Sequence, residues 1–180
     1  MPDNESEQNP WLQWIPELDD GRRFPSLDPD KAEELFGELL AAGKGATLGI
    51  IGCLREVDDG KDWKARFVLG ALASHVSGPG RDQERRDLES WFAGELAGER
   101  SAGVKTFLAM QMQWFAGAAA VPALAAQIGS PDAGLRDAAA AALTAIGSSA
   151  VPALRDARDK VGGDASVTVD HALAQIARMS

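Results

Sequence analysis

Few side chains in this sequence are of the types that perform chemistry. The sequence contains two histidines, His75 and His171, and one cysteine, Cys53. A single cysteine excludes an intrachain disulfide and a thiolate zinc site. No second histidine or cysteine stands at metal-ligand spacing near either histidine, and Cys53 lies in an apolar stretch that favours burial. We therefore expect solvated or capping histidines, no metal site and no cofactor.

The acidic pairs and glycine-rich stretches also lack the setting that catalysis requires. Asp58 and Asp59 stand in a predicted turn, where aspartate is normally solvated and unsuited to general acid–base work. Residues 43–47 (GKGAT) lack the spacing of a phosphate-binding loop, and no strand is predicted before them. We therefore predict no catalytic residues and expect that the protein is not an enzyme.

Composition and charge narrow the remaining classes of function. The chain of 180 residues is 45% hydrophobic and 25% charged, which is typical of a folded domain. Its net charge is −9, of which residues 1–30 carry −6. Because an acidic protein repels phosphate backbones, nucleic-acid binding is not expected. No apolar run approaches the roughly 20 residues that span a membrane, and the acidic N-terminus differs from a signal peptide. We expect a cytoplasmic protein without membrane contact.

An internal repeat of thirty residues organises the C-terminal part of the chain. Residues 120–124 (AVPAL) recur as residues 150–154, and the alignment continues without a gap to Ile146 and Ile176. In the first copy, residues 129–132 (GSPD) divide two helical patterns, because glycine and proline end one helix and polar residues begin the next. One pair of helices cannot bury its apolar faces alone, so three or more stacked copies are expected.

Weaker copies of the same pattern precede this repeat. Apolar residues at helical spacing predict further pairs, and an amphipathic helix at residues 29–42 precedes them, with Asp28 as N-cap and Gly43 after its end. The predicted fold class is all-α, an α-solenoid of about four helical hairpins with an additional N-terminal helix. Residues 28–180 form a single domain in this interpretation. The hairpins are predicted at residues 45–76, 83–117, 119–147 and 149–179.

The segment of residues 120–147 resembles the HEAT-like repeats first named for phycobilisome lyases. The resemblance rests on AVPAL at the start of the first helix, residues 131–132 (PD) in the turn, residues 135–136 (LR) at the start of the second helix and residues 146–147 (IG) at its end. It implies a scaffold, an adaptor or a regulatory subunit. Some proteins with such repeats are chromophore lyases or alkylpurine DNA glycosylases, and a fold-level resemblance does not choose among these roles.

The first part of the chain, residues 1–27, is an acidic leader that contains an apolar cluster. The cluster consists of Trp11, Leu12, Trp14, Ile15 and Leu18. Because such a cluster does not stay bare in water, it either folds back to cap the first hairpin or docks a partner. The other tryptophans, Trp63, Trp91 and Trp114, lie within predicted helices, where we expect them to be buried.

These observations predict a non-catalytic scaffold that binds another protein on a helical surface. Exposed positions of second helices supply the candidate partner-binding residues, together with the two leader tryptophans. The candidates are Trp11, Trp14, Arg66, Lys105, Arg136 and Asp137. The alternatives are an enzyme or enzyme subunit of the HEAT-like kind and a self-assembling structural protein. We expect a monomer or a weak homo-oligomer.

Overall fold

The computed structural model describes residues 9–17, 27–57 and 59–179. Within these ranges every regular element is a helix, so the prediction of an all-α protein is confirmed. The chain divides into two compact units, Met1–His75 and Val76–Ser180, which we call unit 1 and unit 2. The single domain predicted for residues 28–180 stays a prediction.

The described residues of unit 1 form a short 3-10 helix followed by three α-helices. α2 begins at the predicted N-cap, where the Asp28 carboxylate accepts hydrogen bonds from the backbone N–H groups of Asp30 (3.0 Å) and Lys31 (3.4 Å). It ends at Gly43, whose φ of 79° lies in the left-handed region that glycine adopts without steric cost. The elements are η1 (Leu12–Trp14), α2 (Pro29–Ala42), α3 (Lys44–Gly52) and α4 (Trp63–Val76).

The turn at Gly43 sets the internal packing of unit 1. It bends the chain by 108° between α2 and α3, and these two helices make the most extensive backbone contact within the unit. The sequence predicts a hairpin of residues 45–76, in which α3 would pair with α4. In the structure, α3 makes its more extensive contact with α2. The core of the unit contains fully buried aliphatic side chains from all three helices: Leu35, Leu39, Ile50, Ile51, Val68, Leu69 and Leu72.

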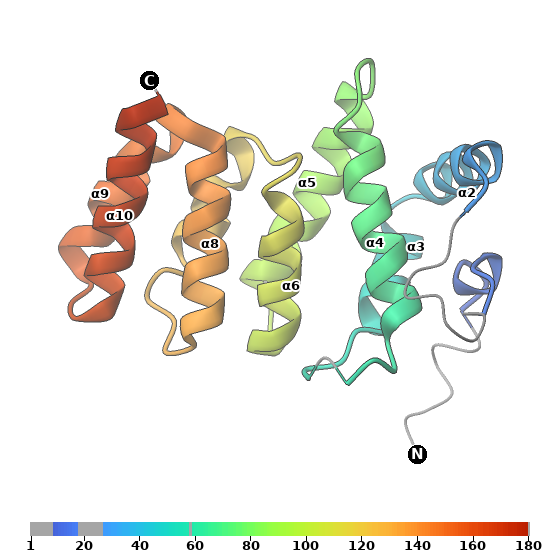
Figure 1. Ribbon diagram of the computed structural model, residues 1–180, viewed down its shortest axis with the longest axis horizontal. Helices are drawn as coiled ribbons and strands as arrows, with labels where there is room; N and C mark the ends of the chain where they lie inside the picture. The colour runs from blue at the N-terminus through green and yellow to red at the C-terminus, as the bar shows by residue number, and fades with distance from the viewer. Residues whose placement is uncertain (1–8, 18–26, 58, 180) are drawn as a thin grey trace. The chain divides into compact units, whose positions relative to one another are not determined.

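Unit 2 contains three consecutive helix pairs that form two rows. In one row α7 contacts α5 and α9, and in the other row α8 contacts α6 and α10. Figure 1 shows α6, α8 and α10 side by side. The elements are α5 (Asp82–Ala97), α6 (Ala102–Met112), η2 (Ala118–Ala120), α7 (Val121–Ala125), α8 (Ala133–Ile146), η3 (Gly147–Ala150), α9 (Val151–Lys160) and α10 (Asp164–Met179).

The core of unit 2 lies between the two rows. Each helix contributes an apolar stripe, because residues three and four apart share a face of a helix. Fully buried members of this core include Leu88, Phe92, Leu108, Leu124, Leu143 and Leu154. The Asp132 carboxylate caps α8 by accepting a hydrogen bond from the Leu135 backbone N–H at 2.8 Å, as the polar end of the GSPD turn favours.

One stretch of the described chain, Ala133–Lys160, is long and apolar enough to cross a membrane by length and composition. It is not one straight helix, because η3 and Gly147, with φ 80°, separate α8 from α9. Its three leucines, Leu135, Leu143 and Leu154, are buried in the core of unit 2. Packing between helices therefore accounts for the leucines of this stretch.

Candidate functional site

The residue types that suggested chemistry do not assemble into a cluster. Within the described ranges, no three His, Cys, Asp or Glu side chains are placed to hold a metal ion. The His75 ring packs against Phe36, with centroids 5.1 Å apart, and its Nδ1 lies 3.6 Å from a Glu33 carboxylate oxygen. The Cys53 thiol is buried and donates to the Gly49 carbonyl oxygen at 3.4 Å. These contacts are structural within unit 1.

The outward surface of α6, α8 and α10 is the first candidate site, and we call it the second-helix face. Buried residues fix the alignment of the helices: Val104 of α6 occupies the position of Leu135 in α8. At an exposed position of the same alignment, Met110 corresponds to Ala141 and to His171. The face therefore has equivalent positions on three neighbouring helices, and a partner could contact all three.

Large apolar side chains of this face lie in solvent, among them Val167 of α10, which is 67% exposed. The side chain of Met110 is 49% exposed and that of Trp114 is 71% exposed. The prediction that Trp114 is buried is wrong, because α6 ends at Met112 and the chain then turns. Phe115 takes the buried position instead, with its ring edge-on to Phe92 at a centroid distance of 5.6 Å.

The turn that carries Trp114 is anchored to α5 by Glu89. One carboxylate oxygen of Glu89, a residue that is only 5% exposed, accepts hydrogen bonds from the backbone N–H groups of Gly117 (3.0 Å) and Ala120 (2.8 Å). Buried Phe115 fixes the turn from within the core. The exposed indole therefore projects from a backbone that is held on both sides.

A groove of about 450 Å³ lies between the exposed sides of α8 and α10 on the same face. Asp137 stands at this groove, and its carboxylate accepts a hydrogen bond from the Thr168 hydroxyl at 3.3 Å. Among the ion pairs of the described residues, none includes Asp137. The groove is lined by Asp137, Ala140, Ala141, Thr144, Val167, Thr168, His171, Ala172 and Gln175.

The remaining repeat residues proposed from sequence have different surroundings. Arg136 is half-buried, and its Nη1 donates to the carbonyl oxygens of Ser130 (2.9 Å) and Pro131 (3.2 Å), so it holds the turn before α8. Lys105 is half-buried on α6. Asp137, by contrast, lines the groove between α8 and α10.

Arg66, near the start of α4, makes hydrogen bonds to other residues of unit 1. The Arg66 Nε donates to Asp62 Oδ1 at 2.9 Å, and its Nη2 donates to the Arg55 carbonyl oxygen at 3.2 Å. The Asp62 side chain is fully buried and also accepts a hydrogen bond from the Arg55 backbone N–H at 2.8 Å. Because a buried carboxylate requires such partners, Arg66 acts here as a structural ion-pair partner.

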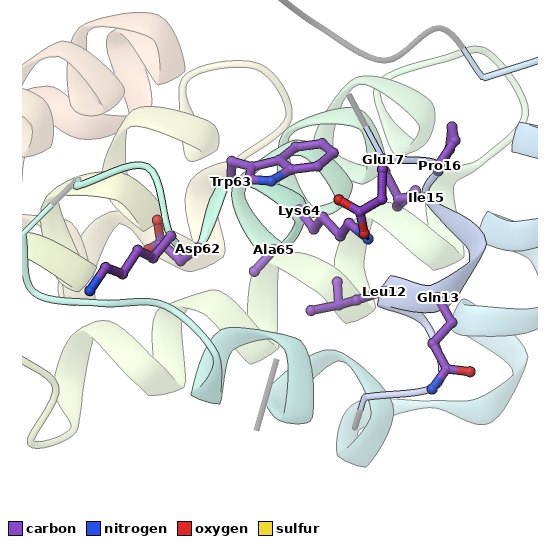
Figure 2. A pocket seen from close by; sticks show the side chains of 10 residues that line it. Leu12, Gln13, Ile15, Pro16, Glu17, Asp62, Trp63, Lys64 and Ala65 are labelled. Atoms are coloured by element: carbon purple, nitrogen blue, oxygen red, sulfur yellow. The ribbon is translucent and has the colours of Figure 1, made fainter. Parts of the chain in front are cut away.

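The second candidate site is a pocket of about 580 Å³ in unit 1, between the leader and the start of α4 (Figure 2). Leu12 and Ile15 are 1% and 2% exposed, so the described part of the leader packs on unit 1 through its aliphatic side chains. The Lys64 ammonium pairs with Glu17 and lies 5.7 Å from the centre of the Trp63 ring. Figure 2 shows the Lys64 and Glu17 side chains meeting beside Trp63.

The two leader tryptophans differ from their aliphatic neighbours. Trp14 is 36% exposed, and Trp11 is half-buried, with its backbone N–H donating to Asn9 Oδ1 at 3.1 Å. Leu18, the last member of the predicted cluster, lies outside the described residues. The fold-back arrangement thus holds for Leu12 and Ile15, while the cap formed by the whole leader stays a prediction.

Sequence reasoning missed Trp114, Met110 and Glu89 as functional or supporting residues. The nearest local signal was Gly117, which comes soon after Trp114 and favours an end of the helix. No family model matches the sequence, and no curated protein matches it significantly. The function is therefore argued from the geometry of the two candidate sites.

Proposed function

We propose that this protein is a non-catalytic scaffold or adaptor of the HEAT-like repeat kind, which binds another protein on its second-helix face. The two rows of helices in unit 2 and the repeated AVPAL motif support an α-solenoid of helical hairpins. The exposure of Trp114 on an anchored turn carries the functional part of the proposal. We expect this scaffold to act in the cytoplasm, as a monomer or a weak homo-oligomer.

The exposure of Trp114 is informative because an indole in water does not contribute the stabilisation that its burial would give to the folded protein. Burial of a large apolar side chain stabilises by about 1.5–3 kcal/mol relative to leaving it in water. Tryptophan is also enriched among the residues that dominate the energy of protein interfaces. Met110, one helical turn before Trp114, adds a flexible apolar side chain that adapts to different surfaces.

Anchoring of the turn adds a second physical argument. A partner that binds a mobile side chain must offset the entropy of ordering it, about 0.5–1.5 kcal/mol for a side chain with many rotamers. The bonds from Gly117 and Ala120 to Glu89 hold the backbone near Trp114 before any partner arrives. The indole is thereby pre-organised for docking.

The test is an affinity capture from source lysate with three forms of the full chain: wild type, Trp114→Ala and Trp14→Ala. Trp14→Ala is the matched control, because Trp14 is a partly exposed tryptophan of unit 1. We expect a protein that is captured by wild type and Trp14→Ala and is weakened at least tenfold by Trp114→Ala. Thermal melts of the three forms should coincide within a few degrees.

Other results would place the binding site elsewhere or contradict the proposal. Loss of the captured protein in Trp14→Ala alone would place the site on the leader. Capture of this same chain, with a doubled mass in light scattering that Trp114→Ala abolishes, would favour the self-assembling alternative. Undiminished capture by Trp114→Ala would contradict the proposal for this face.

A further inference from the structure

The groove between α8 and α10 combines an apolar floor with one acidic group. The floor is made of small side chains, Ala140, Ala141 and Ala172, so it leaves an open volume of about 450 Å³. A groove of this size admits a long side chain of a partner. The apolar floor suits a chain of methylene groups.

The carboxylate of Asp137 defines the charge that the groove accepts. Its hydrogen bond from the Thr168 hydroxyl, at 3.3 Å, leaves its negative charge uncompensated. The other polar groups of the lining are the Thr144 hydroxyl, the Gln175 amide and the His171 imidazole, and none is a fixed cation. The Thr144 hydroxyl already donates to the Ala140 carbonyl oxygen at 2.8 Å.

We propose that the groove receives a lysine or arginine side chain of the protein partner, next to an apolar residue that docks on Trp114. The methylene stem lies on the alanine floor, and the cationic head donates hydrogen bonds to Asp137. This inference rests on the proposed function, because it specifies the chemistry of the partner at the second-helix face.

Two other classes of occupant fit the groove less well. An acidic side chain would place its charge against Asp137, which is unfavourable at short range. A purely apolar side chain would remove water from Asp137 without supplying a hydrogen-bond donor, and an unpaired buried carboxylate is costly. A cationic side chain satisfies both the floor and the carboxylate.

The spacing of helices predicts the spacing of the two anchors in the partner. The helices α6 and α8 are in contact, and the Thr106 side chain of α6 lies close to Gly134 of α8. Packed helices have axes about 8–10 Å apart, so the middle of the α8–α10 groove lies roughly 12–15 Å from the α6 axis. In the same alignment Trp114 is level with residue 145 of α8, about 12 Å further along the helix than Asp137. The two anchors are therefore roughly 17–19 Å apart, a distance that an extended partner segment covers in about five or six residues. The basic residue and the apolar residue are therefore expected about five or six positions apart.

The probe is a library of random 12-residue peptides displayed on phage and panned against the full chain. Selected peptides are then synthesised with a fluorescent label, and their Kd values are measured by anisotropy. The proteins compared are wild type, Asp137→Asn, Trp114→Ala and Asp164→Asn. Asp164→Asn is the matched control, because Asp164 is an exposed aspartate of α10 that does not line the groove.

We expect selected peptides to contain a lysine or arginine about five or six residues from an aromatic or aliphatic residue. Asp137→Asn should weaken their binding about tenfold, because hydrogen bonds between charged groups are stronger than neutral ones. Asp164→Asn should leave the Kd within about twofold.

The remaining outcomes separate the inference from the proposed function. Peptides that depend on Trp114 and bind Asp137→Asn as tightly as wild type would overturn the inference and leave the scaffold proposal standing. Peptides indifferent to both substitutions, or no selected peptides, would contradict both.

Discussion

The two copies of the AVPAL repeat begin alike and end differently. Each copy starts with a short 3-10 helix, followed by an α-helix with proline in its first turn. Leu124 and Leu154, the last residues of the motif, are both fully buried. However, α7 has 5 residues and α9 has 10 residues. The shared motif thus determines the start of the helix, while residues after the motif determine where the helix ends.

The difference after the motif follows from the neighbours of each helix. α7 lies between α5 and α9, whereas the close first-row neighbour of α9 is α7. Four residues after the buried leucine, the first copy has fully buried Ile128 and the second copy has exposed Arg158. Arg158 donates to both carboxylate oxygens of Asp170, at 2.8 and 3.1 Å. The copy whose first helix has two neighbours is apolar at this position, and the copy whose first helix has one neighbour has an ion pair in water.

The starts of the copies are also held by different means. In the first copy the buried Glu89 carboxylate binds the backbone N–H groups of Gly117 and Ala120. In the second copy Gly147, with φ 80°, makes the turn, and its N–H donates to carbonyl oxygens of Leu143 and Thr144. A side-chain anchor from another helix and a left-handed glycine thus serve equivalent positions.

The largest expected effect comes from truncating the shared leucine in each copy. Leu→Ala at a buried position costs about 2–5 kcal/mol, and the cost depends on how well the site can collapse. We expect Leu124→Ala to lower the free energy of unfolding more than Leu154→Ala, because α7 has helices on both sides. Urea titration followed by far-ultraviolet circular dichroism measures both values. Equal losses would mean that the number of neighbours does not set the cost.

The features predicted from sequence are those that local patterns determine. Asp28, Gly43 and the thirty-residue repeat gave the helix ends and pairs, because capping and helical periodicity act over a few residues. The exposure of Trp114 was not predictable in this way. The residue that anchors its turn, Glu89, lies 28 residues before Gly117, and no local signal links them.

The candidate site shows the same division between local and distant causes. Sequence placed Asp137 on an exposed helix face, where the structure also has it. The groove beside it arises because Thr168, 31 residues later, packs opposite Asp137. Arg136 was proposed for partner binding from its exposure on a helix, but its guanidinium folds back onto the turn before α8. Which groups these side chains hydrogen-bond to depends on tertiary packing.

Removal of Glu89 should have the next largest effect and should act on the first copy alone. Glu89→Ala leaves the Gly117 N–H without its acceptor and leaves the Ala120 N–H only its bond to the Gly117 carbonyl oxygen at 3.2 Å, which costs about 1–3 kcal/mol. Hydrogen exchange followed by mass spectrometry should become faster in residues 117–120 and stay unchanged in residues 147–150.

Two variants sharpen the Glu89 experiment. Glu89→Gln retains an oxygen acceptor and should lose less stability than Glu89→Ala. Glu99→Ala removes an exposed glutamate just after the end of α5 and should change the free energy of unfolding by less than about 0.5 kcal/mol. Similar exchange rates in all three variants would show that Glu89 does not hold the turn.

The smallest expected effect belongs to the ion pair that distinguishes the second copy. Hydrogen bonds from Arg158 lower the pKa of the Asp170 carboxyl below its ordinary value of 3.8, and the charge of Arg158 acts in the same direction. A carboxyl whose pKa is lower in the folded state contributes stability above its ordinary pKa and loses it as pH falls through the lowered value. Because both side chains are about half exposed, at 47% and 52%, the contribution is small.

The comparison of Arg158→Ala with wild type therefore depends on pH. At about pH 7 the variant should melt slightly below wild type, and the difference should fade as the solution is acidified below about pH 4, where Asp170 takes up a proton. Ile128→Ala provides the contrast from the first copy, because loss of an apolar contact has no proton linkage and should cost a similar amount at both pH values. A difference for Arg158→Ala that persists at about pH 2 would mean that its aliphatic stem, rather than its charge, stabilises the second copy.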